Sequence, residues 1–378
     1  MAKKDTSRIV ADIATPAVVV DLEILRRNIG RMAEYARQRG VKLRPHTKTH
    51  KCPAIAHLQM RAGASGITVA KVSEAEVMAQ AGAGDILVAF PLVQEEAINR
   101  LLRLQRWVGR IACTVDNLEG ASRLAKAALA SPSPTVLDVL VEVDTGLHRV
   151  GLPPGRPVVE FVRALSELKG LHVRGLLTHA GHGHAAGSRE ELCAIADDEG
   201  RIMAETAGML AEAGLAVEEV SIGSTPTLGV WRGCPGITEI RPGTYVFNDL
   251  SLVELGLAGI EDCALVVLTT VVSHPEPGRL VLDAGSKTLS SDPAHTPESG
   301  FGRIVGYPHL KIEKLYEEHG TIRIMDPPGT RPVPAIGEVL AVIPNHVCPV
   351  VNLADELIVT DHGEIVAKWP VAGRGRVI

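Results

Sequence analysis

The chain has 378 residues and a formal net charge of −5 at pH 7, and 46% of its residues are apolar against 22% charged. This balance supports a large hydrophobic core and excludes a disordered or fibrous protein. It also gives no electrostatic reason to expect a nucleic acid or a membrane as partner. No apolar run approaches the roughly 20 residues that span a bilayer, and six scattered cysteines without a CxxC pair are typical of a reduced compartment. We therefore expect a cytoplasmic globular protein.

Short β-branched segments alternate with Ala/Leu/Glu/Arg-rich segments of helical periodicity through the first two thirds of the chain. This alternation predicts parallel strands joined by crossover helices. Eight such strands fit a closed TIM-like (β/α)8 barrel better than an open α/β sheet, which is the alternative, because no GxGxxG turn follows the first strand. The predicted strands are 41–45, 67–72, 85–90, 110–115, 136–143, 171–178, 216–222 and 238–247, and the predicted helices are 22–39, 73–81, 94–107, 119–130, 156–168 and 188–213.

The pattern changes after about residue 255, where helical periodicity nearly disappears. Strand-like runs separated by Gly, Pro, Asp and Asn follow, and they predict a mostly antiparallel β domain. Residues 8–21 also read as a strand, and we expect the start of the chain to pair with this domain. The predicted division is a barrel over 15–254 and a β domain made of 1–14 and 255–378.

The densest polar cluster is RPHTKTHK, which follows the first predicted barrel strand. Active sites of (β/α)8 barrels lie at the carboxyl ends of the strands. Strand alternation puts Arg44, His46 and Lys48 on one face, which directs Lys48 into the barrel mouth. The cations Arg44 and Lys51 would lower the pKa of Lys48 and favour the neutral amine that Schiff-base chemistry needs. The alternative is a solvated basic loop that binds nothing.

Two polar loops follow the fifth and sixth predicted strands. The first, VEVDTGLHRVG, contains Asp144 and Arg149, which form either a functional polar turn or a purely structural ion pair. The second, LLTHAGHGH, is rich in glycine and has no carboxylate nearby, which disfavours a metal site. We expect His179 to face a cofactor and His182 to transfer a proton.

Two Gly/Ser/Thr turns, SIGSTPT and RPGTYV, follow the seventh and eighth predicted strands. Backbone N–H groups and hydroxyls at such strand ends can bind a phosphate, and these two loops are a common phosphate site in barrels. One such turn is weak evidence, but two at these positions are more specific.

The sequence PNHVCPVVN in the predicted β domain contains His346 and Cys348. On an extended strand their side chains would face the same way. Imidazole and thiolate suit Zn²⁺ best, with Mn²⁺ or another divalent ion as the alternative. Two protein ligands leave positions for water or substrate, as in a catalytic site. Most isolated HxC pairs are structural coincidences.

Together these segments resemble the fold-type III pyridoxal-phosphate enzymes of the D-threonine aldolase and D-serine dehydratase group, which share the alanine racemase architecture. The resemblance extends over nearly the whole chain, in the same order and spacing. The matching segments are TPAVVVDLEILRRNI, LRPHTKTHK, VAKVSEAEVM, VDTGLHRVG, LLTHAGH, IGSTPT, RPGTYVFND, DAGSKTLSSD and PNHVCPVVN.

The resemblance implies that Lys48 carries pyridoxal phosphate and that a divalent metal (Zn, Mn or Mg) binds His346 and Cys348. Alanine racemases lack that metal pair, so racemisation is disfavoured. The other cofactor contacts implied are Arg149 at the phenolic oxygen, His179 at the ring, Arg241 or Tyr245 near the pyridine nitrogen, and Gly223, Ser224, Thr225, Gly243 and Thr244 at the phosphate.

The resemblance further implies a lyase that acts on D-β-hydroxy-α-amino acids. His182 as a base on the hydroxyl would give aldol cleavage of D-threonine to glycine and acetaldehyde, which we favour. Lys48 as a base at Cα would give dehydration of D-serine or D-threo-3-hydroxyaspartate, with which a His-x-Cys pair is associated. The family forms head-to-tail homodimers in which the partner chain would supply the metal pair. A non-catalytic pyridoxal-phosphate homeostasis protein is a more distant alternative, because such proteins lack the C-terminal β domain.

Overall fold

The computed structural model describes residues 13–294, 296, 299–327 and 329–378, and its contacts divide the chain into two compact units. The barrel unit comprises 30–48, 53–243 and 375–378. The β unit comprises 49–52, 244–374 and the described part of the first 29 residues. Residues 15–29 and 244–254 are thus grouped with the β unit, whereas the sequence-based division assigned them to the barrel. The segment 1–12, predicted to belong to the β domain, lies outside the described residues.

Eight parallel strands form the sheet of the barrel unit, in the order β2-β9-β8-β7-β6-β5-β4-β3. A bridge between His46 and Thr68 joins the two ends of this order and closes the ring. The predicted (β/α)8 barrel is confirmed, and the open sheet is excluded. The strands are β2 (Lys42–Leu43), β3 (Ile67–Val69), β4 (Asp85–Pro91), β5 (Arg110–Val115), β6 (Leu137–Glu142), β7 (Leu171–Leu177), β8 (Glu219–Ile222) and β9 (Glu239–Ile240).

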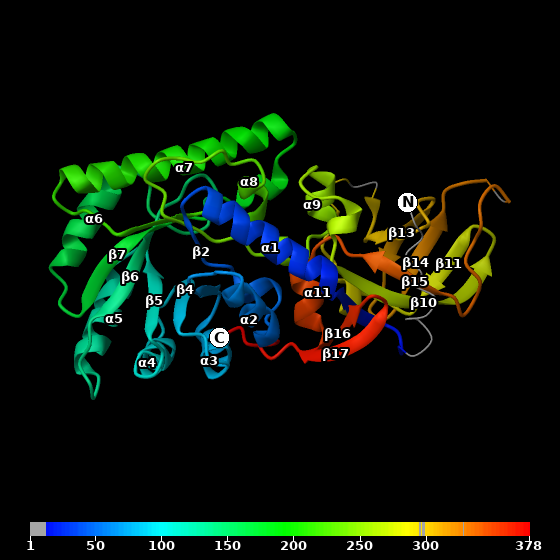
Figure 1. Ribbon diagram of the computed structural model, residues 1–378, viewed down its shortest axis with the longest axis horizontal. Coiled ribbons are helices and arrows are strands. Elements are labelled where there is room, and N and C mark those ends of the chain that lie inside the picture. The colour runs from blue at the N-terminus through cyan, green and yellow to red at the C-terminus, as the bar shows by residue number, and fades with distance from the viewer. Residues whose placement is uncertain (1–12, 295, 297–298, 328) are drawn as a thin grey trace. The chain divides into compact units, whose positions relative to one another are not determined.

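Helices cover the outside of the barrel strands, as Figure 1 shows for α3 to α7. The amphipathic spacing explains this: α4 buries Ile98, Leu101 and Leu102 and exposes Glu95, Glu96 and Arg103. Each of the six predicted helices is present, whereas α2 and α8 were not predicted. The helices are α1 (Leu22–Gln38), α2 (Pro53–Arg61), α3 (Val72–Gln80), α4 (Glu95–Leu104), α5 (Leu118–Ala130), α6 (Arg156–Ser166), α7 (Arg189–Glu212) and α8 (Thr225–Leu228).

The β unit contains a closed barrel of six strands, because β10 pairs with both β11 and β15 in the order β11-β14-β13-β12-β15-β10. Outside this barrel, β1 pairs antiparallel with β10 and parallel with β16, and β17 follows at the edge. The predicted mostly antiparallel domain is confirmed. Its strands are β1 (Ala17–Asp21), β10 (Leu265–Glu276), β11 (Arg279–Leu282), β12 (Arg303–Ile304), β13 (Leu310–Leu315), β14 (Gly320–Ile324), β15 (Val339–Ile343), β16 (Glu356–Asp361) and β17 (Glu364–Pro370); its short helices are α9 (Leu250–Glu254), α10 (Ser286–Leu289) and α11 (Val347–Leu353).

None of the helices in the described residues is both long and apolar enough to cross a membrane.

Side chains inside the barrel lie in layers, because alternate residues of each strand point inward. Leu87, Ala112, Leu140 and Leu177 form a small apolar cluster of their own. The same alternation puts charged residues at the amino-terminal ends of these strands on the same inward face. It also puts polar residues on that face at the carboxyl ends. The apolar layer therefore separates two polar layers.

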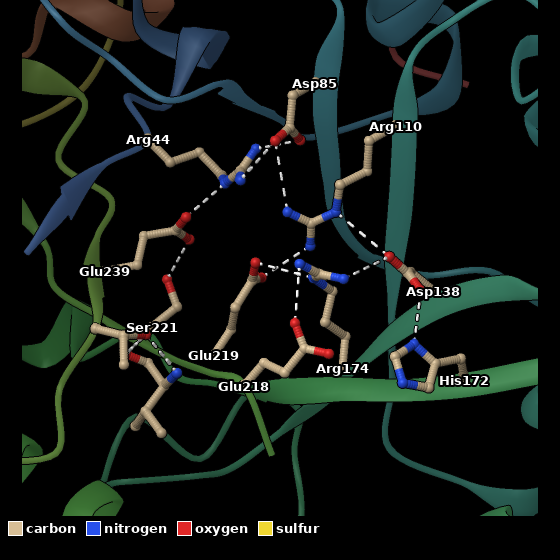
Figure 2. Close-up of polar contacts among 12 residues, drawn as sticks. Arg44, Asp85, Arg110, Asp138, His172, Arg174, Glu218, Glu219, Ser221 and Glu239 are labelled. Atoms are coloured by element: carbon tan, nitrogen blue, oxygen red, sulfur yellow. Dashed lines mark hydrogen bonds and ion pairs between the residues drawn. The ribbon is translucent and has the colours of Figure 1, made fainter.

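The amino-terminal layer is a network of ion pairs across the lumen (Figure 2). Arg110 Nη2 on β5 lies 2.8 Å from Glu219 Oε2 on β8, although two strands separate β5 from β8 in the sheet. Arg44 donates to both oxygens of Asp85 at 2.7 and 3.1 Å, and its Nε donates to Glu239 at 2.8 Å. Arg44 and Glu239 are almost fully buried. Opposite charges that neutralise each other therefore fill this end of the barrel, where aliphatic residues are usual.

We expect Arg44→Met to destabilise the barrel unit by about 3–5 kcal/mol, because it leaves buried carboxylates without their partner. The free energy of unfolding from urea titration measures this loss. Arg103→Met is the matched control, since Arg103 pairs with Glu96 while 56% of its side chain is exposed, and such pairs contribute about 0–1 kcal/mol. An Arg44→Met protein as stable as the control would contradict the structural role of the network.

Candidate active site

Lys48 lies in a single 3₁₀ turn, Thr47–Thr49, directly after the first barrel strand. Thr47 Oγ1 anchors this turn by donating to Glu74 Oε1 at 2.7 Å and to Thr68 O at 3.1 Å. The N–H of Lys48 donates to His46 Nδ1 at 3.3 Å, so His46 stabilises the turn. Lys48 is thus at the carboxyl end of β2 as predicted, but the extended alternation used to predict it is wrong because the chain has already turned.

The sequence analysis expected the cations Arg44 and Lys51 to lower the pKa of Lys48, and the structure shows that both of them have hydrogen-bond partners of their own. Arg44 is held by Asp85 and Glu239, which raise its pKa against the effect of burial. Lys51 Nζ is buried and donates to Gly373 O at 3.3 Å. The charge of Arg44 therefore serves the lumen network.

His179, after β7, lies among three predicted site residues. Burial lowers its pKa well below the usual value, and the positive charges of Lys48, Arg149 and Arg241 lower it further. His179 therefore shares its electrostatic environment with Lys48, Arg149 and Arg241, which the sequence analysis also assigned to the site. At neutral pH His179 is an uncharged imidazole in a positively charged surrounding.

Arg241, after β9, is buried and has an incompletely used guanidinium group. Its Nη2 donates to Thr178 O, whereas its Nη1 is buried without a hydrogen-bond partner among the described residues. Burial lowers the pKa of Arg241, with Glu239 and Glu142 opposing this effect. A buried guanidinium N–H of this kind requires an acceptor, so Arg241 marks a position that a ligand atom could occupy.

The predicted phosphate turns follow two neighbouring strands, since Ile222 of β8 pairs with Ile240 of β9. Gly223 has φ +104°, and a Cβ there would lie 2.9 Å from Leu228 Cδ1, so only glycine fits. Its N–H donates to Glu199 Oε1 at 2.9 Å. Ser224 caps α8 through a reciprocal hydrogen-bond pair with Thr227. The Gly223 N–H and the Ser224 hydroxyl, both predicted to bind phosphate, therefore already have hydrogen-bond partners inside the protein, which the sequence did not reveal.

The remaining predicted phosphate residues have different environments. Thr225 begins α8 and is partly buried, and Gly243 ends the second barrel segment. Thr244 and Tyr245 are buried in a 3₁₀ turn, Thr244–Val246, that belongs to the β unit. The predicted set is therefore divided between the two units of the chain.

The loop after β6 is organised by Asp144. Burial would raise the pKa of this carboxyl, but hydrogen bonds from His148 and Gly146 outweigh it and lower the pKa. Asp144 Oδ2 lies 2.8 Å from His148 Nδ1, so its ring partner is His148, whereas the sequence suggested Arg149. The Arg149 side chain is exposed.

The same loop packs against His182. Thr145 Oγ1 is 2.9 Å from Thr178 Oγ1, which joins the loops after β6 and β7. Gly146, at φ +125°, leaves room for the His182 ring, since a Cβ there would lie 3.2 Å from His182 Cε1 and Nε2. His182 Nδ1 is buried without a hydrogen-bond partner among the described residues. The imidazole is thus fixed by packing while this nitrogen remains available.

His346 and Cys348 lie at the start of α11, so the predicted extended strand is wrong. His346 is the residue before the helix and Cys348 is its second residue. The side chains are nevertheless together: burial lowers the pKa of His346, but interactions with Cys348 and Asp292 outweigh it and raise the pKa to about 9. Cys348 Sγ lies 3.4 Å from Thr49 Oγ1, the residue after Lys48 in the sequence. Within the described part of the chain, no group of three His, Cys, Asp or Glu side chains could hold a metal.

Sequence reasoning missed three buried or partly buried carboxylates at these positions. Glu142 at the end of β6 has a pKa raised by burial, with Arg241 and Arg149 opposing. Glu199 on α7 accepts from the N–H groups of Ala180 and Gly223. Asp292 contacts His346 at 2.6 Å. Glu199 lies within a long helical pattern, so the sequence gave no indication of its role.

Known families and proteins match the chain over nearly its full length. Residues 20–250 match the family described as alanine racemase, N-terminal domain, and residues 264–360 match the putative serine dehydratase domain. D-threonine aldolase of Arthrobacter sp. is 34% identical, covering 97% of this chain and 94% of that protein. D-threo-3-hydroxyaspartate dehydratase of Delftia sp. (strain HT23) is 34% identical, covering 88% and 90%.

Solved structures agree with these matches. The D-threonine aldolase from Filomicrobium marinum superposes with a TM-score of 0.87 at 34% identity, covering 98% of each chain. A D-threo-3-hydroxyaspartate dehydratase with one cysteine replaced by alanine, described as a metal-free form, superposes with a TM-score of 0.89 at 32% identity, covering 96% of this chain and 98% of that one. The relatives comprise aldolases and dehydratases, which are both lyases. The chain belongs to the family of fold-type III pyridoxal-phosphate enzymes that includes D-threonine aldolase and D-threo-3-hydroxyaspartate dehydratase and shares the alanine racemase architecture.

Proposed function

We propose that the protein is a pyridoxal-phosphate- and divalent-metal-dependent lyase of D-β-hydroxy-α-amino acids, and that it cleaves D-threonine to glycine and acetaldehyde. The observation that carries this proposal is the position of Lys48, His179 and Arg241 at the carboxyl ends of the barrel strands β2, β7 and β9, where Arg241 Nη1 is buried without a hydrogen-bond partner among the described residues. This end of a barrel is where catalytic residues lie. The family relationship supplies the chemistry that such a grouping serves.

The residues present fit pyridoxal phosphate. The cofactor is anionic, and the site gathers cations around a neutral imidazole. Arg241 Nη1 is a buried donor without a partner in the described residues, as an arginine that binds the cofactor ring would be. Lys48 is the proposed covalent attachment point, because it follows the first barrel strand at the end of the barrel where catalytic residues lie.

The pair His346 and Cys348 fits a divalent ion. One nitrogen and one sulfur ligand form a donor set that suits Zn²⁺ and also accepts other transition ions. Two protein ligands leave coordination positions for the substrate hydroxyl. The metal-free cysteine variant of the related dehydratase supports a metal role for this residue type.

The roles of the chain's own residues follow from these positions. Pyridoxal phosphate, when bound, supplies an electron sink for charge developing at Cα of the amino acid. His182 takes the proton of the β-hydroxyl through its imidazole, which lets the Cα–Cβ bond break toward an aldehyde. His179, whose pKa burial lowers well below its usual value, would lie beside the cofactor ring as a neutral imidazole. Gly146 keeps the His182 ring in place because no side chain occupies its position.

Dehydration is the second candidate, and Cys348 favours it. The cysteine-to-alanine variant in a metal-free form belongs to a dehydratase. In this reaction Lys48 Nζ would take the proton at Cα, and a divalent ion held by His346 and Cys348 would polarise the β-hydroxyl so that it leaves as water; hydrolysis of the dehydrated product would give a 2-oxo acid and ammonia. The two candidates share the cofactor and metal residues and differ in the base, which is His182 acting on the β-hydroxyl for cleavage and Lys48 acting at Cα for dehydration.

Product analysis with D-threonine and D-serine distinguishes these reactions. We expect glycine and acetaldehyde from D-threonine, and loss of turnover in EDTA with recovery on adding Zn²⁺ or Mn²⁺. Ammonia together with a 2-oxo acid would establish the dehydratase instead. If neither set of products forms and the protein racemises alanine instead, the proposal is overturned.

Lys48→Ala should remove both the activity and the absorbance band of the lysine-bound cofactor near about 410–430 nm. Lys71→Ala is the matched control and should keep the band, because Lys71 is engaged with Phe90. Borohydride reduction followed by peptide mapping identifies the modified lysine. A cofactor adduct on Lys51 or Lys71 in the Lys48→Ala protein would contradict the assignment.

Cys348→Ala should keep the cofactor band but lose the bound metal and at least 100-fold in kcat, because one remaining ligand holds a divalent ion poorly. Cys348→Asp should regain activity with Mn²⁺, since a carboxylate is a harder anionic ligand and is favourable in the first turn of a helix. Cys234→Ala, a partly buried cysteine of the barrel unit, should behave as wild type. Unchanged metal content in Cys348→Ala would contradict the metal site.

We also propose a head-to-tail homodimer in which each subunit supplies its metal pair to the partner's barrel. Mixing inactive Lys48→Ala and His346→Ala proteins should then restore about a quarter of wild-type activity, because half of the dimers carry one intact site. Refolding an equimolar mixture and measuring turnover tests this exchange. An inactive mixture would show that each chain uses its own pair, as the contact between Cys348 and Thr49 in one chain would allow.

A further inference from the structure

The segment DAGSKTLSSD, which the family resemblance marked without a role, ends beside the metal pair. Its last residue, Asp292, accepts a hydrogen bond from His346 Nδ1 at 2.6 Å, although the two residues are 54 positions apart. Both belong to the β unit. Asp292, which is not one of the two proposed metal ligands, thus contacts the His346 ring directly.

Asp292 is itself fixed by its main chain. Its N–H donates to Ser290 Oγ at 3.2 Å, and its carbonyl accepts from Asn345 Nδ2 at 3.0 Å. The same Asn345 amide donates to Gly300 O at 2.9 Å. Asn345 and His346 are consecutive residues, and both donate hydrogen bonds to Asp292. Asn345 donates to its carbonyl and His346 to its carboxylate.

The main chain of His346 is fixed from its other side. The N–H of Val347 donates to Asp249 Oδ2 at 3.2 Å. Asp249 is fully buried and also accepts from Ser251 Oγ at 2.6 Å. With the backbone held on both sides of His346, the rotation and tautomer of its ring depend on the contact with Asp292.

We propose that Asp292 is a positioning residue for the divalent metal, an inference that rests on the proposed metal site. By accepting the proton on Nδ1, Asp292 keeps the lone pair of Nε2 free for the ion beside Cys348. Metal-binding histidines usually donate their second nitrogen to a carboxylate in this way, and loss of that carboxylate weakens metal binding about 10–100-fold.

The contact is too exposed to serve mainly as a stabilising ion pair. The side chains of His346 and Asp292 are 41% and 47% exposed, and pairs with such exposure contribute about 0–1 kcal/mol. Removing Asp292 should therefore leave the β unit folded. This makes metal affinity, measured separately from stability, the informative quantity.

The test titrates chelator-stripped, cofactor-loaded protein with Zn²⁺ in competition with a chromophoric chelator. Asp292→Ala should weaken Zn²⁺ binding 10–100-fold with Tm and the cofactor band unchanged. Asp292→Asn should show a smaller loss, because its amide oxygen can still accept from Nδ1. Asp355→Asn is the control, since Asp355 is an exposed aspartate of the same unit paired with Arg374.

Three results would overturn the inference in distinguishable ways. Wild-type affinity in Asp292→Ala would show that the contact does not orient His346. A changed Co²⁺ absorption spectrum in Asp292→Asn, at a metal content equal to wild type, would show that Asp292 is a ligand itself. A wild-type protein that binds no Zn²⁺ would overturn the proposed metal site, whereas a missing cofactor band alone would overturn only the role of Lys48.

Discussion

The ion pairs across the barrel lumen are the interaction on which the site depends. Arg44 joins the end of β2 to Asp85 of β4 and Glu239 of β9, two strands on either side of the point where the ring closes. With only 3% aromatic residues in the chain, large rings are scarce as filling for the lumen. Long arginine side chains with carboxylate partners occupy that space instead, and Arg44, Glu219 and Glu239 are almost fully buried there.

The charged layer also organises the opposite end of the barrel. Glu239 lies on β9 and Arg241 follows the end of this strand two residues later, so both point inward, one into the ion-pair layer and the other to the candidate site. Glu239 already accepts hydrogen bonds from Arg44 and Ser221, so its carboxylate is shared and is not a dedicated partner of Arg241. Its Nη1 is left buried without a partner in the described structure. The ion-pair network at one end of the barrel therefore leaves Arg241 Nη1 as a donor that a ligand atom could accept from.

The proximity of His346 and Cys348 depends on a different structural feature, the start of the short helix α11. His346 and Cys348 converge because the chain turns into α11 between them, and Asp249 accepts the first helical N–H. The contacts around His346 come from residues distant in sequence, Asp292 and Asp249. These contacts lie within the β unit, whereas Lys48 belongs to the barrel unit.

The sequence by itself determined the barrel and the β domain, and it singled out Lys48, His346 and Cys348 as candidate site residues. Strand and helix periodicity are local properties, and burial selects them directly, so all eight barrel strands and six of its helices were predictable. Lys48 and the His–Cys pair were identified because their motifs are contiguous. Only the tertiary structure decided the role of Arg44, the turn at Lys48, the helix at Cys348 and the contacts of Glu199 and Asp292. Each of these depends on a hydrogen bond or ion pair between residues that are distant in the sequence, and local periodicity carries no information about such partners.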